Sequence, residues 1–167
     1  TIASQTKVPP MPNLPFTETE FRTRLTRVKA RMASDGIDVL VVTEPANIYY
    51  LTGYDAWSFY TTQALVVFQD IELPLWIGRM MDALTARVTT YLPEDRVVPY
   101  PDIYVNSKDR HAAQFIAARI LREAPSAAVI GVEMGAYYYT ARDHAELVKA
   151  MPNARFKDAE LLVNCRL

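Results

Sequence analysis

The residue types best suited to nucleophilic, acid–base or metal chemistry are scarce in this chain, which has two histidines and one cysteine. His111 and His144 fall on predicted helices, and neither belongs to an HExxH motif or another pair with metal-ligand spacing. Cys165 stands in an apolar terminal segment, with no histidine nearby to activate it. We therefore predict no catalytic residue and no metal ligands here, and interpret both histidines as surface or helix-capping residues.

Motifs that bind phosphates or dinucleotides are also missing from the sequence. It contains no GxSxG elbow, P-loop or GxGxxG fingerprint. GVEMG (131–135) has two glycines after an apolar run, but their spacing favours a tight turn from strand to loop over a dinucleotide site. The sequence thus predicts no cofactor site in this chain.

One segment, 49–60, is rich in aromatic residues that are mixed with polar side chains around Gly53. Its rings are Tyr49, Tyr50, Tyr54, Trp57, Phe59 and Tyr60. They can simply pack the core. Alternatively, because the segment lacks helical or strand periodicity, the rings can form a binding surface for a small, flat or cationic ligand. On that interpretation we expect Tyr54, Trp57, Phe59 and Tyr60 to be exposed or half-exposed.

The composition is that of an ordinary globular protein. Of 167 residues, 50% are hydrophobic and 22% charged, and the formal net charge is −1. Without a basic excess we expect no nucleic-acid partner, and the apolar runs are far shorter than a membrane span of about 18 residues. A single cysteine allows no internal disulfide, and no signal peptide is recognisable, so we expect a cytoplasmic protein. Residues 1–15 are predicted to be an extended arm.

The first helix is marked by local signals at both ends. Thr17 and Glu20 have the spacing of a capping box, and Phe16 and Phe21 have that of a hydrophobic staple. Gly36 suits a left-handed cap and ends the helix.

Short apolar runs after this helix are predicted to be strands: 37–43, 63–68, 73–77, 96–100 and 127–133, with a last short strand in ARFKDA. We expect 37–43 and 127–133 to be buried on both faces, and 96–100 to be an edge strand because prolines accompany it. The side chains expected to be nearly fully buried are Val39, Val41, Leu65, Val67, Ile130 and Val132.

Helices are predicted between these strands. One covers 79–92, one follows Asp109 as N-cap, and one follows the capping pair Thr140 and Asp143. Segment 44–54 is predicted to be a turn and an irregular stretch. Helices that alternate with buried strands predict an α/β fold: a single three-layer domain over 16–167, with a central mixed β-sheet flanked by helices.

The segment GIDVLVVTEPANIYYLTGYDAWSFY (36–60) resembles the opening of the creatinase/prolidase N-terminal domain, which has a ribonuclease-H-like fold. The resemblance extends over nearly the whole chain, and the part common to that family includes Asn47, Tyr50, Leu51, Thr52 and Gly53. Narrower motifs look most like ectoine hydrolase and its relatives: Tyr54-Asp55-x-Trp57-Ser58-Phe59-Tyr60, Gly78-Arg79-x-Met81-Asp82-Ala83, Tyr100-Pro101-Asp102-x-Tyr104 and Arg110-His111.

The resemblance implies a larger parent protein, in which a C-terminal catalytic "pita-bread" domain follows this one. Peptidases of the family hold two divalent metal ions in that domain through Asp, Asp, His, Glu and Glu, whereas creatinase-like members work without metal. The parent's metal use therefore stays open. In this family the N-terminal domain serves dimerisation and places its aromatic loop at the active site of the neighbouring subunit. The resemblance thus assigns Tyr54, Trp57, Phe59 and Tyr60 to the entrance for a small-molecule substrate.

One position departs from the creatinase pattern. Creatinases carry a Phe and an Arg in the aromatic loop, and both reach the substrate. Phe59 keeps the Phe, whereas Thr61 stands where the Arg would be. The bidentate carboxylate clamp is absent at this position, which disfavours creatine as the parent's substrate unless an arginine elsewhere replaces it.

Three functional interpretations stay open. The first is a non-catalytic N-terminal domain of a C–N bond hydrolase that acts on ectoine or a similar small cyclic amidine or amidino compound. The second is the same domain from an Xaa-Pro aminopeptidase or dipeptidase. The third is a stand-alone binding or assembly module. We expect a piece of a longer protein, because the chain lacks an initiator Met and stops in the apolar segment ELLVNCRL, which disfavours the third interpretation.

Overall fold

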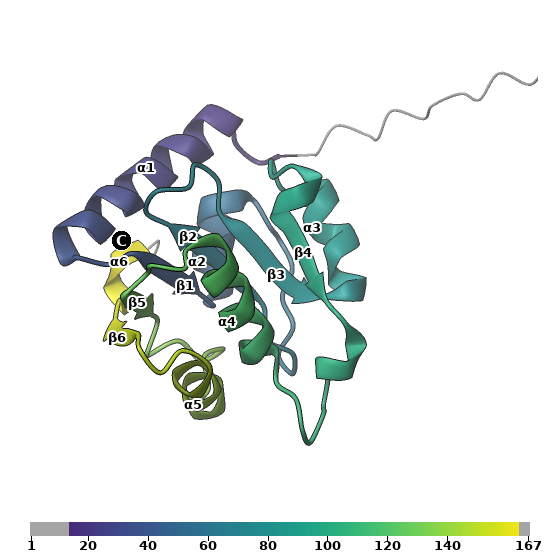
Figure 1. Ribbon diagram of the computed structural model, residues 1–167. Helices are drawn as coiled ribbons and strands as arrows, with labels where there is room; N and C mark the ends of the chain where they lie inside the picture. The colour runs from purple at the N-terminus through teal and green to yellow at the C-terminus, as the bar shows by residue number, and fades with distance from the viewer. Residues whose placement is uncertain (1–13, 164–167) are drawn as a thin grey trace, which may run out of the picture.

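The computed structural model describes residues 14–163, and its centre is one six-stranded β-sheet (Figure 1). Across the sheet the strands are β4 (Val97–Tyr100), β3 (Leu75–Arg79), β2 (Ala64–Phe68), β1 (Val39–Val42), β5 (Val129–Val132) and β6 (Arg155–Asp158). The pairs β1–β2 and β2–β3 are antiparallel, whereas β1–β5, β3–β4 and β5–β6 are parallel. The sheet is therefore mixed, and β4 lies at its edge, as predicted.

The helices of the described residues are α1 (Glu18–Asp35), α2 (Pro45–Thr52), α3 (Ala83–Thr89), α4 (Ala112–Glu123), α5 (Ala141–Ala150) and α6 (Glu160–Val163). Short 3-10 turns are η1 (Met80–Asp82), η2 (Glu94–Arg96) and η3 (Asp102–Tyr104). In Figure 1, α4 crosses the face of the sheet that is turned toward the viewer. No helix among residues 14–163 is both long and apolar enough to cross a membrane.

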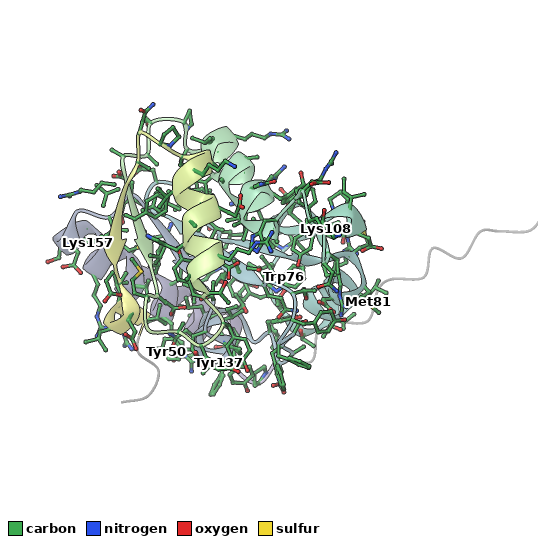
Figure 2. The ribbon with its side chains drawn as sticks, turned by 90° about the horizontal axis from the view of Figure 1, so that it is seen from below. Tyr50, Trp76, Met81, Lys108, Tyr137 and Lys157 are labelled. Carbon is green, nitrogen blue, oxygen red and sulfur yellow. The ribbon has the colours of Figure 1, made fainter. Side chains whose placement is uncertain are left out.

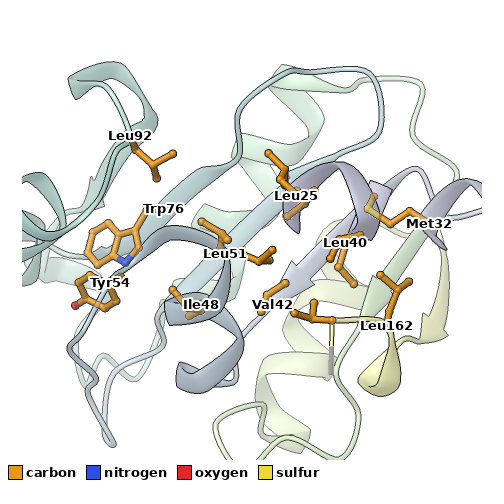
Figure 3. Packing of buried hydrophobic residues seen from close by; sticks show 14 of the residues in the cluster. Leu25, Met32, Leu40, Val42, Ile48, Leu51, Tyr54, Trp76, Leu92 and Leu162 are labelled. Carbon is orange, nitrogen blue, oxygen red and sulfur yellow. The ribbon is translucent and has the colours of Figure 1, made fainter. Parts of the chain in front are cut away.

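Alternating side chains of the strands divide the core between the two faces of the sheet. Leu40 and Val42 pack in the cluster that also contains residues of α1, α2, α3 and α6, which Figure 3 shows from close by. Val39 and Val41 pack in the opposite cluster, with residues of α4 and α5. Helices thus cover both faces, and the predicted three-layer α/β fold is confirmed.

The burial predicted for the strands is confirmed at every named position. None of the six side chains is more than 1% exposed: Val39, Val41, Leu65, Val67, Ile130 and Val132. Runs of β-branched and leucine residues suffice for this prediction, because a strand covered on both faces must be apolar on both faces.

Helix α1 begins and ends where its local signals indicate. The Thr17 hydroxyl accepts a hydrogen bond from the Glu20 backbone N–H at 3.2 Å, and the rings of Phe16 and Phe21 lie 6.0 Å apart. Gly36 ends the helix in the left-handed region with φ of 64°. The Glu20 carboxylate pairs with Arg24, so α1 has only the first hydrogen bond of the predicted capping box, whereas Thr140 and Asp143 form the capping box of α5 in full.

The prediction of a turn and an irregular stretch over 44–54 is wrong, because residues 45–52 form helix α2. Pro45 stands in its first turn, where no backbone N–H is required, and Gly53 ends it with φ of 83°. The helix is too short to show apolar periodicity clearly. Its Pro and Gly were the usable signals.

Two other helix boundaries also differ from the prediction. The helix predicted over 79–92 is shorter, because Arg79 still belongs to β3 and η1 follows it. The N-cap of α4 is His111 rather than Asp109, and its Nδ1 accepts a hydrogen bond from the Ala113 backbone N–H at 3.2 Å. Most of the arm predicted over 1–15, and also Cys165, lie outside the described residues.

Candidate aromatic binding surface

Three aromatic side chains near the end of the segment 49–60 are exposed together. Trp57 is 59% exposed, Phe59 72% and Tyr60 53%. Ring centroids lie 6.0 Å apart between Trp57 and Phe59, and 5.6 Å apart between Phe59 and Tyr60. The exposure predicted for these three residues is confirmed. Their contiguous rings are called the aromatic surface below.

The exposure predicted for Tyr54 is wrong, because this side chain is only 1% exposed. Its ring lies 5.2 Å from that of Trp76 in the core, as Figure 3 shows, and its hydroxyl accepts a hydrogen bond from Gln63 Nε2 at 3.0 Å. Burial, together with the nearby charge of Asp82, raises the pKa of Tyr54 to about 12. Both alternatives for the aromatic segment are therefore partly correct: Tyr54 packs in the core, whereas Trp57, Phe59 and Tyr60 are exposed.

Two further tyrosines, which lie outside the segment 49–60, adjoin the aromatic surface. Tyr137 is 84% exposed, and Figure 2 places it at the outside of the molecule while Trp76 lies within. Tyr138 is half-buried, and its ring lies 6.0 Å from Trp57 and 5.4 Å from Tyr137. The tyrosine run just after the GVEMG turn is the signal that would have found them.

Hydrogen bonds fix the loop that carries the aromatic surface. Thr61 Oγ1 donates to Ser58 Oγ at 2.7 Å, and Thr62 Oγ1 donates to Asp143 Oδ1 at 2.8 Å. The Tyr100 hydroxyl donates to the Thr62 carbonyl at 2.8 Å. Thr61 is itself buried. The Thr61 side chain, which stands at the position of the creatinase arginine, thus contributes a hydrogen bond within this loop.

Arg79 approaches the aromatic surface from the end of β3. Its Nη1 donates to the Tyr60 hydroxyl, and its guanidinium carbon lies 5.2 Å from the centre of the Tyr60 ring. The same guanidinium pairs with Asp82, with Nη2 3.0 Å from Oδ1 and Nε 3.3 Å from Oδ2. Arg79 is thus paired with Asp82 on one side and in contact with Tyr60 on the other.

An open recess lies beside the aromatic surface, and its lining combines rings with polar groups, among them Phe59, Tyr60, Tyr138, His111 and Asp143. Ring faces attract cations and flat groups, while hydroxyl and carboxylate oxygens accept hydrogen bonds from them. The arrangement therefore suits a small, flat, positively charged ligand.

Both histidines hold elements of the fold. His111 Nδ1 accepts the capping hydrogen bond of α4 and lies 3.9 Å from Asp143 Oδ1. His144 Nδ1 shares a hydrogen bond of 2.9 Å with the Tyr139 hydroxyl. Within residues 14–163, no three His, Cys, Asp or Glu side chains are grouped so that they could hold a metal ion.

The GVEMG turn contributes a buried carboxylate that binds the start of α2. Glu133 is 1% exposed and accepts hydrogen bonds from the backbone N–H groups of Thr43 at 2.6 Å and Glu44 at 2.8 Å, and from Asn47 Nδ2 at 2.6 Å. These bonds satisfy the start of α2, the helix that leads into the aromatic segment. Burial raises the pKa of Glu133 above its ordinary value, although the hydrogen bonds act in the opposite direction.

A family model described as the creatinase/prolidase N-terminal domain matches residues 24–167. The chain belongs to this family. The resemblance that rests on residues 36–60 is thereby confirmed, and the six-stranded mixed sheet is the sheet of a creatinase/prolidase N-terminal domain.

Curated relatives of this creatinase/prolidase domain are longer proteins. An uncharacterised hydrolase/peptidase of Sinorhizobium fredii, y4tM, is 70% identical over 151 residues, and the ectoine hydrolase of Halomonas elongata is 44% identical over 156 residues. The matches cover 90% and 92% of this chain, but 38% and 39% of the relatives. The chain thus spans about two fifths of the length of these relatives.

Solved structures share the fold at low sequence identity. A proline dipeptidase from Streptococcus pneumoniae superposes with a TM-score of 0.65 and 23% identity, over 81% of this chain and 90% of that one. The N-terminal domain of an Xaa-Pro dipeptidase from Lactobacillus brevis superposes with a TM-score of 0.68 and 18% identity, over 84% and 97%. These similarities establish the fold of the creatinase/prolidase domain.

Proposed function

We propose that this creatinase/prolidase domain is the non-catalytic N-terminal part of a C–N bond hydrolase, and that the parent hydrolyses ectoine or a similar small cyclic amidine. The observation that supports it most is the 44% identity to an ectoine hydrolase over 92% of the chain. The relatives have more than half of their length beyond the matched region, which supports a separate catalytic domain as the chain's partner.

The aromatic surface is the part of the chain that we assign to the substrate. A protonated cyclic amidine is flat and positively charged, and such a group is attracted to ring faces like those of Trp57, Phe59 and Tyr60. These rings face solvent in the single chain. In the proposed parent homodimer they line the entrance to the active site of the neighbouring subunit, so the domain acts in trans and also serves dimerisation.

The alternative is the N-terminal domain of an Xaa-Pro aminopeptidase or dipeptidase. The names of solved structures such as the proline dipeptidase of S. pneumoniae point to that activity, but at 23% identity or less they support only the fold. The identity to ectoine hydrolase is higher, and it includes the aromatic segment within its range. A stand-alone binding module is the remaining alternative, and a parent without a catalytic domain would favour it.

The test compares substrates on the purified parent enzyme. Turnover of ectoine without turnover of Xaa-Pro dipeptides, with and without added divalent metal, supports the proposal. The reverse preference supports the peptidase alternative. Turnover of ectoine, creatine or Xaa-Pro peptides by the 167-residue chain alone would contradict its assignment as non-catalytic.

The in-trans role has its own test in the parent. Trp57→Ala and Phe59→Ala should each lower kcat/KM by about tenfold, which is roughly 1.4 kcal/mol of lost transition-state binding. Leu121→Ala, at an exposed apolar position near the end of α4, is the matched control and should leave kcat/KM unchanged. A fully active monomeric parent, identified by its mass in solution, would contradict the role in trans.

A further inference from the structure

A continuous series of contacts leads from the end of β3 to the aromatic surface. Asp82 pairs with the guanidinium of Arg79 through two atoms, at 3.0 and 3.3 Å, and Arg79 contacts both the hydroxyl and the ring of Tyr60. Tyr60 lies edge-on to Phe59, whose ring in turn contacts Trp57. The exposed rings are therefore connected to a rigid element of the sheet through one ion pair.

The pair is itself fixed from the core side. Gln63 Nε2 donates to Asp82 Oδ2 at 3.0 Å and to the hydroxyl of buried Tyr54 at 3.0 Å. The side chains of Arg79 and Asp82 are only 15% and 17% exposed. An ion pair with this little exposure and two bonded atoms on each partner holds its geometry better than a surface pair.

The aromatic surface needs such support because its loop has no regular structure. Residues 53–63 form neither helix nor strand, and three of their rings are more than half exposed. Exposed side chains without packing partners sample several rotamers, and fixing them on binding costs conformational entropy. A ring that is already held in its binding orientation avoids part of this cost.

We propose that Arg79 and Asp82 are positioning residues, which hold Tyr60, and through it Phe59 and Trp57, in the orientation that receives the substrate. The inference rests on the proposed function of the aromatic surface and adds residues that do not touch the substrate. It also gives a physical reason for the Gly78-Arg79-x-Met81-Asp82-Ala83 motif. Gly78 belongs to the same arrangement, because a Cβ there would stand 2.4 Å from the Trp76 ring that packs on Tyr54.

The first experiment observes the surface itself in the 167-residue chain. 5-Fluorotryptophan labels the two tryptophans of the sequence, so that 19F NMR reports on the exposed Trp57 and on the buried Trp76 as an internal control of the fold. Arg79→Lys keeps the charge but cannot bond Asp82 and Tyr60 together, and Asp82→Asn removes the counter-charge. Both should shift and broaden the Trp57 signal while the Trp76 signal stays in place.

A second variant shows whether Arg79 acts through Tyr60. Tyr60→Phe keeps the ring and removes the hydroxyl that Arg79 contacts, so adding Arg79→Lys to it should change the Trp57 signal much less than in the wild-type background. The matched control is Arg119→Lys, since Arg119 pairs with Glu123 on α4 at 21% exposure and away from the surface. An unchanged Trp57 signal in both Arg79→Lys and Asp82→Asn would overturn the proposal.

The second experiment measures the same variants in the parent enzyme. Loss of preorganisation should raise KM by about fivefold and leave kcat nearly unchanged. If the variant only unfolds in a fraction of the molecules, the apparent kcat decreases while KM stays constant. An altered Trp57 signal with unchanged KM, in an enzyme that loses activity with Trp57→Ala, would also overturn the inference. If Trp57→Ala itself leaves the kinetics intact, the proposed function of the surface fails, and this result is distinct from failure of the positioning pair alone.

Discussion

The ring of Trp57 lies 6.0 Å from the ring of Tyr138 at an interplanar angle of 63°, an edge-on geometry that aromatic pairs favour. The contact joins the loop before β2 to the loop after β5. Strands β2 and β5 both pair with β1, β2 in the antiparallel and β5 in the parallel direction. The start of β2 and the end of β5 therefore lie at the same end of the strands, beside the end of β1. The topology therefore assembles the surface from segments far apart in the sequence.

Replacement of Tyr138 should loosen Trp57. In a Trp76→Phe background, where Trp57 is the only tryptophan, Tyr138→Ala should make Trp57 fluorescence more accessible to acrylamide, because the ring that contacts it is gone. Tyr137→Ala is the control, since the ring of Tyr137 contacts Tyr138 instead of Trp57. Equal quenching in the Trp76→Phe chain with and without Tyr138→Ala would show that the contact with Tyr138 does not determine the accessibility of Trp57.

The burial of Tyr54 has a thermodynamic consequence. Tyr54→Ala should lower the free energy of unfolding by roughly 3–5 kcal/mol, as for other buried aromatic side chains, and Tyr54→Phe by about 1 kcal/mol for the bond from Gln63. Trp57→Ala should stay within about 0.5 kcal/mol, because its side chain is exposed. Urea unfolding of the 167-residue chain measures all three. Similar losses for Tyr54→Ala and Trp57→Ala would mean that both rings belong to the core.

The parts of the fold that depend on local chemistry could be predicted from the sequence. The buried strands follow from short β-branched runs, and the ends of α1 follow from Thr17 and Gly36, because the atoms that satisfy these signals lie within a few residues. Gly53 ends α2 by the same rule, although the sequence prediction had no helix over 44–54. These positions would have the same interpretation in many other folds.

The parts that depend on tertiary contacts could not be predicted. The burial of Tyr54 depends on its contacts with Trp76 in β3 and with Gln63, which directly precedes β2. Tyr138 joins the surface only because β5 lies beside β1. The spacing of apolar residues could identify neither the burial of Tyr54 nor the contact of Tyr138, because residues 53–63 form neither helix nor strand. The family resemblance identified the segment, but it did not separate the ring that packs inward from those that face solvent.

The start of α4 can be tested directly, because its N-cap is His111 instead of the predicted Asp109. His111→Ala should lower the free energy of unfolding by about 1 kcal/mol, because the Ala113 N–H then loses its side-chain partner. Asp109→Ala should have little effect, since His111 occupies the cap position and the Asp109 side chain is not the cap. Thermal unfolding of the two variants decides between them. A larger loss for Asp109→Ala would restore the boundary predicted from the sequence.

The buried Glu133 should make stability depend on pH in a defined direction. Its pKa in the folded chain is raised above the ordinary value of 4.5, mainly by burial, so the folded state keeps this proton at pH values where the unfolded chain has lost it. Its contribution to the free energy of unfolding is therefore fully present below 4.5 and is lost as the pH rises through the raised pKa.

Glu133→Gln isolates this contribution, because the amide does not titrate while the other carboxyl groups stay the same. The free energy of unfolding of wild type minus that of the variant, measured in urea at several values from about pH 4 to pH 7, should decrease as the pH rises. A constant contribution of either sign is expected on top, since the amide cannot accept all the hydrogen bonds from Thr43, Glu44 and Asn47. A difference that increases with pH would mean that these three hydrogen bonds favour the carboxylate by more than burial disfavours it, and that the pKa is lowered.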